Sequence, residues 1–328
     1  MDITKTASGQ TPIALSGVTI RTQADWDQYI NTFYDNLVDE IDGEINENAL
    51  MGFFRENTQT KDVEITKTKV KGNAVAKINE DGSPISFVTW GQGWAYSWYV
   101  YPYRIGVRHT RHLEEIEDFG EVAQEGMEIK DASSRTIKFA LADVFNRGVA
   151  PGSGAPFLCY DGMYLIDGAR PNPVIGTPDW DNEETTGDLT EDLLFTASQN
   201  TENMKAHNGD ELNLSIQEIL IPRTHDQVMW KLWETPKEVG NAQNTHNWAA
   251  GRFQYQTVRE FTGNTIYYRL GNPKSDDNGL QIRWAVRPGV ADINFEDPDI
   301  MGKRMRFRFG LGCLDPRKMW RGGMLNAV

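Results

Sequence analysis

The sequence has few cysteines and histidines, which limits both disulfide and metal chemistry. Its 328 residues include two cysteines, Cys159 and Cys313, and five histidines. Two cysteines are too few for a disulfide framework, and their separation favours free thiols in a reducing compartment, with a single pairing left open. His109 and His112 stand three residues apart, but no further ligand follows at zinc spacing. We therefore predict no bound metal and no cofactor.

Long apolar runs and an excess of positive charge are also missing. No segment approaches the roughly 18 apolar residues of a transmembrane helix, so we expect no membrane partner. The N-terminal residues lack the basic and apolar regions of a secretion signal. The net charge is −14, which argues against a general nucleic-acid binder, because such proteins neutralise phosphates with a basic face. The negative charge is compatible with a protein that encloses nucleic acid without binding it.

Recognisable catalytic motifs are absent as well. The sequence contains no P-loop, no GxGxxG after a predicted strand and no GxSxG. Residues 179–192 are acidic but lack the ligand order of an EF-hand loop. We predict that the protein is not an enzyme. Its ten tryptophans and many carboxylates keep open a carbohydrate-active enzyme or a sugar-binding module.

The longest helical pattern covers residues 112–147. Apolar residues recur there at steps of three and four, and no proline interrupts them. The pattern predicts one long helix. The alternative is two helices broken near Gly126 or residues 131–134, because glycine costs about 1 kcal/mol inside a helix. We expect any bend to lie at these positions, and Gly126→Ala to stiffen the helix.

A second amphipathic helix is predicted for residues 22–44. Its stripe is formed by Trp26, Ile30, Phe33, Leu37 and Ile41. The stripe favours core packing, and docking on a neighbouring subunit is the alternative.

Residues 61–109 predict an extended β-hairpin. An Asp-Gly turn signal lies within residues 79–83, and residues 85–107 follow as one strand. This strand contains three closely spaced tryptophans, Trp90, Trp94 and Trp98. Three roles stay open for the cluster: core, subunit interface, or a platform that stacks sugars or single-stranded bases.

The second half of the chain mixes short helices and strands. Residues 149–157 form a Gly/Pro/Ser hinge, the predicted domain boundary. Helices are predicted for residues 189–206 and 224–234, the latter with Thr224 as N-cap and Val228, Trp230 and Leu232 on its apolar side. Strands are predicted for residues 218–222, 252–261, 265–270, 280–286 and 303–314. In the last strand, Met305, Phe307 and Phe309 alternate with Arg304, Arg306 and Arg308.

Charge is unevenly distributed between two segments. Residues 179–192 carry acidic side chains, including Asp181 and Glu183, without a basic one, and residues 303–321 are mostly basic. Solvated faces explain both segments. The alternative is that copies of the chain meet through these opposite charges.

The order of these elements resembles the tailed-phage major capsid proteins of the HK97-like fold, with the Mu-like major head subunits as the candidate branch. The residues that carry the resemblance are YDGMYLIDG (160–168) with the acidic loop after it, the run from residue 189 to 234, NWAAGRFQYQTV (247–258) and the closing RFRFG strand (306–310). The motifs are degenerate, and the order of elements covers nearly the whole chain.

The resemblance implies an α+β fold with named parts. Residues 1–60 would form the N-arm with its amphipathic helix, and residues 61–108 the extended E-loop hairpin. Residues 109–155 would hold the spine helix of the peripheral domain, residues 156–263 the axial domain, and residues 264–328 the peripheral sheet and C-terminus. The lysine–asparagine cross-link of some members is not carried over, because no partner asparagine is identified.

The resemblance also implies a function. The chain would assemble in the host cytoplasm with itself, as pentamers and hexamers, into an icosahedral virion shell around double-stranded DNA, without sequence-specific contact. Scaffold, portal and decoration proteins would be further partners. An encapsulin-like compartment shell is the alternative with the same fold. The candidate subunit contacts are Trp26, Phe33, Trp90, Trp94, Trp98, Asp181, Glu183, Trp248, Arg304, Arg306 and Arg308.

Overall fold

A computed structural model describes most of the chain. The described residues are 23–58, 63–70, 91–110, 119–149, 157–171, 179–184, 189–206, 211–235, 247–271, 279–293 and 300–324. The chain divides into two compact units. The first comprises Met1–Glu44, Tyr103–Arg135 and Pro288–Phe307, and the second Ile45–Pro102, Thr136–Arg287 and Arg308–Val328.

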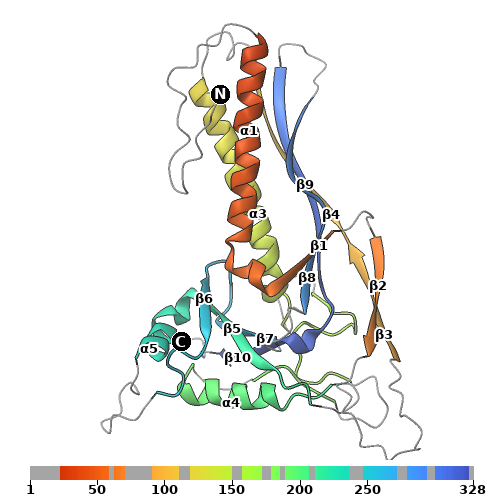
Figure 1. Ribbon diagram of the computed structural model, residues 1–328, viewed down its shortest axis with the longest axis vertical. Coiled ribbons are helices and arrows are strands. Elements are labelled where there is room, and N and C mark those ends of the chain that lie inside the picture. The colour runs from red at the N-terminus through yellow and green to blue at the C-terminus, as the bar shows by residue number, and fades with distance from the viewer. Residues whose placement is uncertain are drawn as a thin grey trace, which may run out of the picture. The chain divides into compact units, whose positions relative to one another are not determined.

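Two long helices, α1 (Gln23–Asn46) and α3 (Phe119–Asn146), run side by side (Figure 1). The stripe predicted for α1 is buried at Ile30, Leu37 and Ile41. Tyr34 joins it with 1% of its surface exposed, a member that the sequence pattern missed. Between the helices, Lys130 Nζ lies 2.8 Å from Glu40 Oε2 and 3.2 Å from Glu44 Oε1.

Helix α3 is continuous through Gly126 and residues 131–134, so the predicted single helix is confirmed and the two-helix alternative is wrong. The start predicted at residue 112 lies outside the described residues. Glycine is tolerated at position 126 because the packing against α1 requires a residue without a side chain. An added Cβ would lie 2.5 Å from Phe33 Cε1 and 3.1 Å from Leu37 Cδ1.

A four-stranded sheet has the order β1-β8-β9-β4. Its strands are β1 (Phe54–Thr58), β8 (Leu280–Asp292), β9 (Ile300–Cys313) and β4 (Tyr101–Thr110). β1 pairs with β8 in parallel, from Phe54 opposite Leu280 to Thr58 opposite Trp284. The alternation predicted for β9 is confirmed, because Met305, Phe307 and Phe309 are buried and Arg306 is exposed.

The predicted ribbon is confirmed as an antiparallel pair, β2 (Val63–Val70) and β3 (Gly91–Tyr99), with Val63 opposite Tyr99. The turn predicted for residues 79–83 lies outside the described residues. The single strand expected through residues 85–107 is wrong at Val100. There the chain leaves β3 and begins β4, which belongs to the other sheet.

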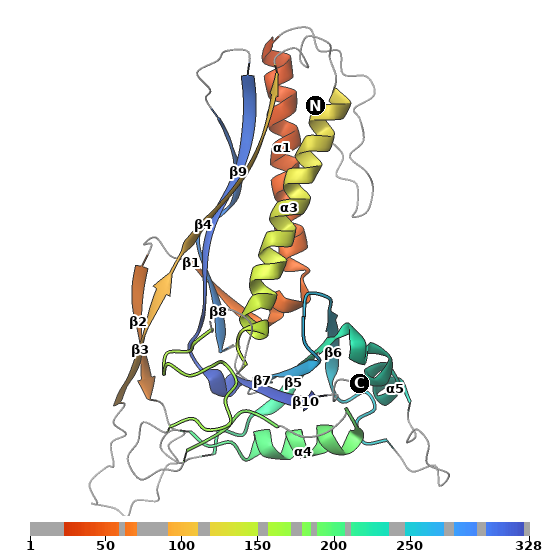
Figure 2. The ribbon, with the colours of Figure 1, turned by 180° about the vertical axis from the view of Figure 1, so that it is seen from behind.

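The second unit contains a sheet of order β10-β7-β5-β6. Its strands are β10 (Met319–Met324), β7 (Thr265–Gly271), β5 (Ser215–Pro222) and β6 (Gln254–Val258). Helix α4 (Glu191–Glu202) packs along this sheet against β5 and β10, as Figure 2 shows. Leu194, Ala197, Ile219, Ile266 and Tyr268 are fully buried in the resulting core.

An aromatic cluster around Phe145 forms a second part of this unit's core. Phe145 is fully buried, and its ring centroid lies 5.1 Å from that of Tyr267 and 6.1 Å from those of Phe53 and Phe54. Phe53 ends the short 3-10 helix η1 (Ala49–Phe53). The Tyr267 hydroxyl donates to the Phe145 carbonyl over 2.9 Å, so burying this tyrosine leaves no polar group unsatisfied.

Helix α5 (Asp226–Glu234) corrects two details of the sequence prediction. Thr224 is not its N-cap. It lies in the 3-10 turn η2 (Arg223–His225), and its hydroxyl bonds to Asn264 Oδ1 over 3.1 Å. The buried residue of α5 is Met229, whereas Val228 and Trp230 are exposed. No helix in the described part of the chain is both long and apolar enough to span a bilayer.

Candidate functional site

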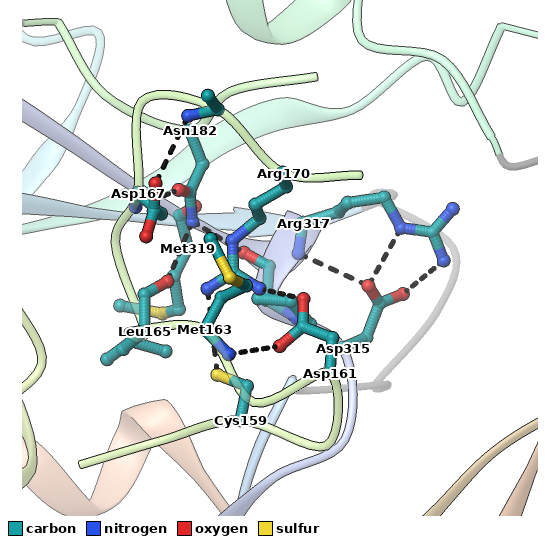
Figure 3. A network of polar contacts seen from close by, with 12 residues as sticks. Cys159, Asp161, Met163, Leu165, Asp167, Arg170, Asn182, Asp315, Arg317 and Met319 are labelled. Atoms are coloured by element: carbon teal, nitrogen blue, oxygen red, sulfur yellow. Dashed lines mark hydrogen bonds and ion pairs between the residues drawn. The ribbon is translucent and has the colours of Figure 1, made fainter. Parts of the chain in front are cut away.

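A concentrated group of buried polar side chains lies in the second unit, between the described residues of 157–184 and residues 313–321 (Figure 3). At its centre is an ion pair between Arg170 and Asp161, whose side chains are 0% and 4% exposed. Arg170 Nη1 lies 2.5 Å from Asp161 Oδ2. The guanidinium also stacks 5.3 Å from the ring of Trp180. A charge buried this deeply is tolerated only because it is paired.

Asn182 joins the two segments directly. Its Nδ2 donates to the carbonyl of Leu165 over 2.9 Å and to those of Pro316 and Met319 over 3.1 Å each. Its Oδ1 accepts from the Asp167 N–H over 2.9 Å. A fully buried amide with four partners holds the segment at residues 165–167 against the one at residues 316–319.

Two further ion pairs border this network. Arg317 binds Asp315 through two bonds, from Nε over 2.9 Å and from Nη2 over 3.1 Å. Burial would raise the pKa of Asp315, but the Arg317 guanidinium outweighs it and holds that pKa below its ordinary value. Arg321 Nη1 lies 2.6 Å from Glu183 Oε1.

Both cysteines lie in the segments that this network joins. Cys159 is 4% exposed and Cys313 is fully buried. Arg170 Nη2 lies 3.8 Å from Cys159 Sγ. Burial, and then the Cys159 thiol, raise the pKa of the Cys313 thiol well above its ordinary value. Both cysteines are free, which is the alternative that the sequence favours.

The network is built for cohesion. Its charged groups are paired with each other, and burial raises the pKa of the neighbouring Tyr160 hydroxyl, so this phenol stays protonated. Among the described residues, no group of three or more His, Cys, Asp or Glu side chains is placed to hold a metal ion.

Some of the residues predicted as subunit contacts have partners within their own chain. Phe33 covers the position of Gly126. Trp248 packs edge to face on Phe195, with ring centroids 5.1 Å apart, and carries the Arg252 guanidinium 4.2 Å above its ring. Glu183 pairs with Arg321 of the same chain, so part of the complementarity between the acidic and basic segments is satisfied without a second copy.

The other predicted contact residues are exposed, half-buried, or have side chains outside the described residues. Asp181 and Arg306 are exposed, and Arg304 and Arg308 are half-buried. Trp26, Trp94 and Trp98 lie in α1 and β3, but their side chains are outside the described residues, and so is Trp90 altogether. Their role as subunit contacts stays a prediction.

Sequence reasoning missed the exposed apolar side chains of α5. Trp230 on α5 is 54% exposed, and Val228 and Trp233 are each 37% exposed. Tyr99 and Tyr101, on either side of Val100, are 57% and 61% exposed. The α5 sequence DQVMWKLWE gives no clear signal, because its apolar residues are nearly consecutive and the structure buries only Met229 among them.

A scan against protein-family models and a search of curated proteins find no match to this sequence. Solved structures do match. A structure from Mycobacterium phage Patience aligns with a TM-score of 0.50 at 9% identity, over 98% of this chain and 96% of that chain. The capsid of an empty GTA particle aligns with a TM-score of 0.50 at 10% identity, over 84% and 90%.

The chain has the HK97-like capsid fold. The predicted α+β class and capsid fold are thereby confirmed, and at this identity the likeness shows the fold alone. A virus-like particle from Pyrococcus furiosus also aligns, with a TM-score of 0.49 at 9% identity, over 90% of this chain and 99% of that chain. Assignment to the Mu-like branch stays a prediction.

Proposed function

We propose that this chain is a major capsid protein, which assembles with copies of itself, as pentamers and hexamers, into an icosahedral virion shell around double-stranded DNA. The observation that carries the proposal is the alignment over 98% of this chain and 96% of a phage structure. A match over nearly the full length of both chains accounts for the helices, both sheets and the ribbon together. The proposed role is structural, without enzymatic activity.

The parts of the chain take roles in this shell. Residues 1–60 are the N-arm and residues 61–108 the E-loop, whose described part is the β2–β3 pair. Residues 109–155 and 264–328 supply the peripheral domain, and residues 156–263 the axial domain. Many weak contacts between copies would then give a stable shell, because each bound copy raises the effective concentration of its next contact.

The charge of the chain suits enclosure of DNA. A net charge of −14 disfavours adhesion to phosphates, so packaged DNA would be confined by the wall rather than bound to it. Assembly in the host cytoplasm, with scaffold, portal and decoration proteins as further partners, completes the proposal.

The experiment is expression of the full chain followed by size-exclusion chromatography and negative-stain electron microscopy. Shells, or rings of five or six copies, are expected. A chain that stays monomeric across salt, pH and concentration, and also with the scaffold of its own system, would contradict the proposal. Shells that enclose a specific protein cargo would favour a compartment over a virion.

A further inference from the structure

One face of strands β4 and β9 is directed towards helix α1 within the first unit. Tyr103 of β4 stacks on Phe307 of β9, with ring centroids 5.4 Å apart, and Phe307 is buried. Lys303, on the same face of β9, donates from Nζ to Asn31 Oδ1 of α1 over 2.7 Å. The side chains on this face are therefore used in packing the unit.

The opposite face of the same two strands is basic. Successive side chains of a strand alternate between its faces, so Arg304 and Arg306 of β9 point away from α1. Gly106 of β4 faces the same way, because an added Cβ there would lie 3.4 Å from Arg304 Cβ. Arg104 and Arg108, two residues before and after Gly106, share that side. These four arginines are the basic face; Arg304 is half-buried and the other three are exposed.

The basic face costs stability in a single chain. The partners of Tyr103 and Gly106 follow in reverse order along β9. The two strands are therefore antiparallel, and Arg104 lies opposite Arg306. Like charges directly opposite one another on a sheet are destabilising. β4 and residues 300–307 contain no acidic side chain, and no described carboxylate makes an ion pair with the basic face. An acidic partner would remove this repulsion.

The helix side of the same unit is acidic. Helix α1 contains no lysine or arginine, and Asp35 and Asp39 are exposed on it. Glu128 and Asp131 are exposed on α3. These four carboxylates are the acidic face, and none makes an ion pair with a described residue. Arg135 is the one exposed cation on the described helices of this unit.

The two charged faces belong to opposite sides of the unit. Figure 1 and Figure 2 both show α1 and α3 on one side of β4 and β9. A single chain therefore cannot bring its own basic face and acidic face together, whereas two copies can.

We propose that the basic face of one copy binds the acidic face of a second copy, in a head-to-tail contact. The inference rests on the proposed function, because it names a contact through which copies of this chain assemble. Complementary charges would fix the register and orientation of the two copies. Each bound copy still offers one face of each sign, so the contact repeats and closes as a ring of copies.

Double-stranded DNA is the other polyanion that a row of arginines could bind. The second copy is favoured because it carries a matching set of carboxylates in the same unit. The net charge of −14 also repels phosphates at long range, whereas a neighbouring copy can be oriented so that opposite charges meet.

The test reverses the charge of each face in the full chain. Arg104→Glu with Arg306→Glu, and separately Asp35→Arg with Asp39→Arg, should each raise the protein concentration at which light scattering detects assembly by at least about tenfold. The chain with all four substitutions again carries opposite charges on its two faces. Its threshold should fall at least about threefold below that of either double variant. All four positions are exposed, so the unfolding midpoints in urea should stay near wild type.

Lys205→Glu with Arg259→Glu is the matched control. Both positions are exposed in the second unit, and the pair changes the net charge as much as the reversal of Arg104 and Arg306 does. Its threshold should stay within about threefold of wild type. An equal rise in the control would trace the effect to net charge and overturn the contact. If a double variant fails to fold, Arg306→Gln decides, with an expected rise of at least about twofold.

The outcomes separate this contact from the proposed function. A wild-type chain that never assembles would contradict both. A wild-type chain that assembles, with both double variants at the same threshold or with no recovery in the fourfold variant, would overturn the contact alone. Fluorescence anisotropy with a double-stranded DNA oligonucleotide covers the other partner. DNA binding that is lost in the Arg104 and Arg306 variant, without any effect on assembly, would assign the basic face to DNA and overturn the proposal.

Discussion

The ring of Phe33 occupies the space beside Gly126, so that an added Cβ at position 126 would lie 2.5 Å from Phe33 Cε1. Two amphipathic helices thus approach closely at one point. The close approach explains why a residue with poor helix propensity lies inside a 28-residue helix. Gly126 is a packing residue of the α1–α3 pair.

Gly126→Ala is therefore expected to destabilise the protein, although the sequence alone predicted a stiffer helix. Either Phe33 or the helix backbone must move, and overpacking of this kind costs about 1–3 kcal/mol. The free energy of unfolding in urea, measured on unassembled protein, would show the loss.

Gly43→Ala is the matched control. Gly43 is exposed in α1, and an added Cβ there meets nothing within 4 Å. The substitution should stabilise the protein by up to about 1 kcal/mol, because alanine has the higher helix propensity. Equal stabilisation by both substitutions would refute the packing role of Gly126.

Tyr34 gives a prediction about alkaline pH. Its hydroxyl is buried without a hydrogen-bond partner among the described residues. Burial, and then the charge of Glu125, raise the pKa of Tyr34 from 10.0 to about 12. A tyrosine in the unfolded chain loses its proton near pH 10, whereas Tyr34 in the folded chain keeps it. The stability that this group contributes is complete below about pH 10 and is lost as pH rises towards 12, by roughly 3 kcal/mol in all.

Tyr34→Phe removes this titration and leaves no donor unsatisfied. We expect near wild-type stability at neutral pH and a shallower loss of stability above pH 10 than in the wild type. Burial also raises the pKa values of Tyr267 and Tyr268, so the difference between variant and wild type is the quantity to measure. A difference that is the same at about pH 9 and pH 11 would count against the titration of Tyr34.

Asn182 gives a prediction about the buried network. Asn182→Ala would remove the Nδ2 group that donates to the carbonyls of Leu165, Pro316 and Met319. Buried carbonyls without partners cost about 1–3 kcal/mol each, and neighbouring losses do not simply add. We expect the free energy of unfolding to fall by at least about 2 kcal/mol. Asn182→Asp should be worse, because it points a carboxylate at carbonyl oxygens.

Asn203→Ala is the control for this loss. Asn203 is exposed, and it ends α4 through its backbone N–H rather than its side chain. Its substitution should stay within about 0.5 kcal/mol of wild type. If Asn182→Ala were equally mild, the network would not hold the two segments together.

Local periodicity was enough to predict both long helices, the alternation of β9 and the antiparallel ribbon. What it could not supply are the contacts between distant segments. The FRENT strand β1 has no apolar alternation, and it becomes a strand only by pairing with β8. β10 contains two glycines, and at Gly322 an added Cβ would lie 2.6 Å from the Tyr268 ring. β10 was not predicted, because glycine weakens a strand pattern and the neighbour that requires it is remote in sequence.

The candidate site shows the same limit. Free cysteines are the alternative that the sequence favours, but the burial of both side chains depends on how the segment after α3 and the end of β9 pack in the fold. Glu183 and Arg321 were identified as opposite charges that could join two copies, and the fold pairs them within one. Composition identifies side chains of opposite charge, but it does not say whether they pair within one chain or between two copies.

The exposed face of α5 gives the last prediction, which concerns assembly. Trp230 is 54% exposed on a helix whose buried residue is Met229. Large aromatic side chains at this exposure are typical of protein interfaces, where tryptophan often dominates the binding energy. Trp230→Ala should leave the unfolding free energy of the unassembled chain within about 0.5 kcal/mol of wild type. It should weaken the contact between copies by roughly 2 kcal/mol.

Gln227→Ala, at an exposed polar position on the same helix, is the control. Light scattering against protein concentration would measure the threshold for assembly, which should rise for Trp230→Ala alone. An unchanged threshold would place this face of α5 outside the contacts between copies.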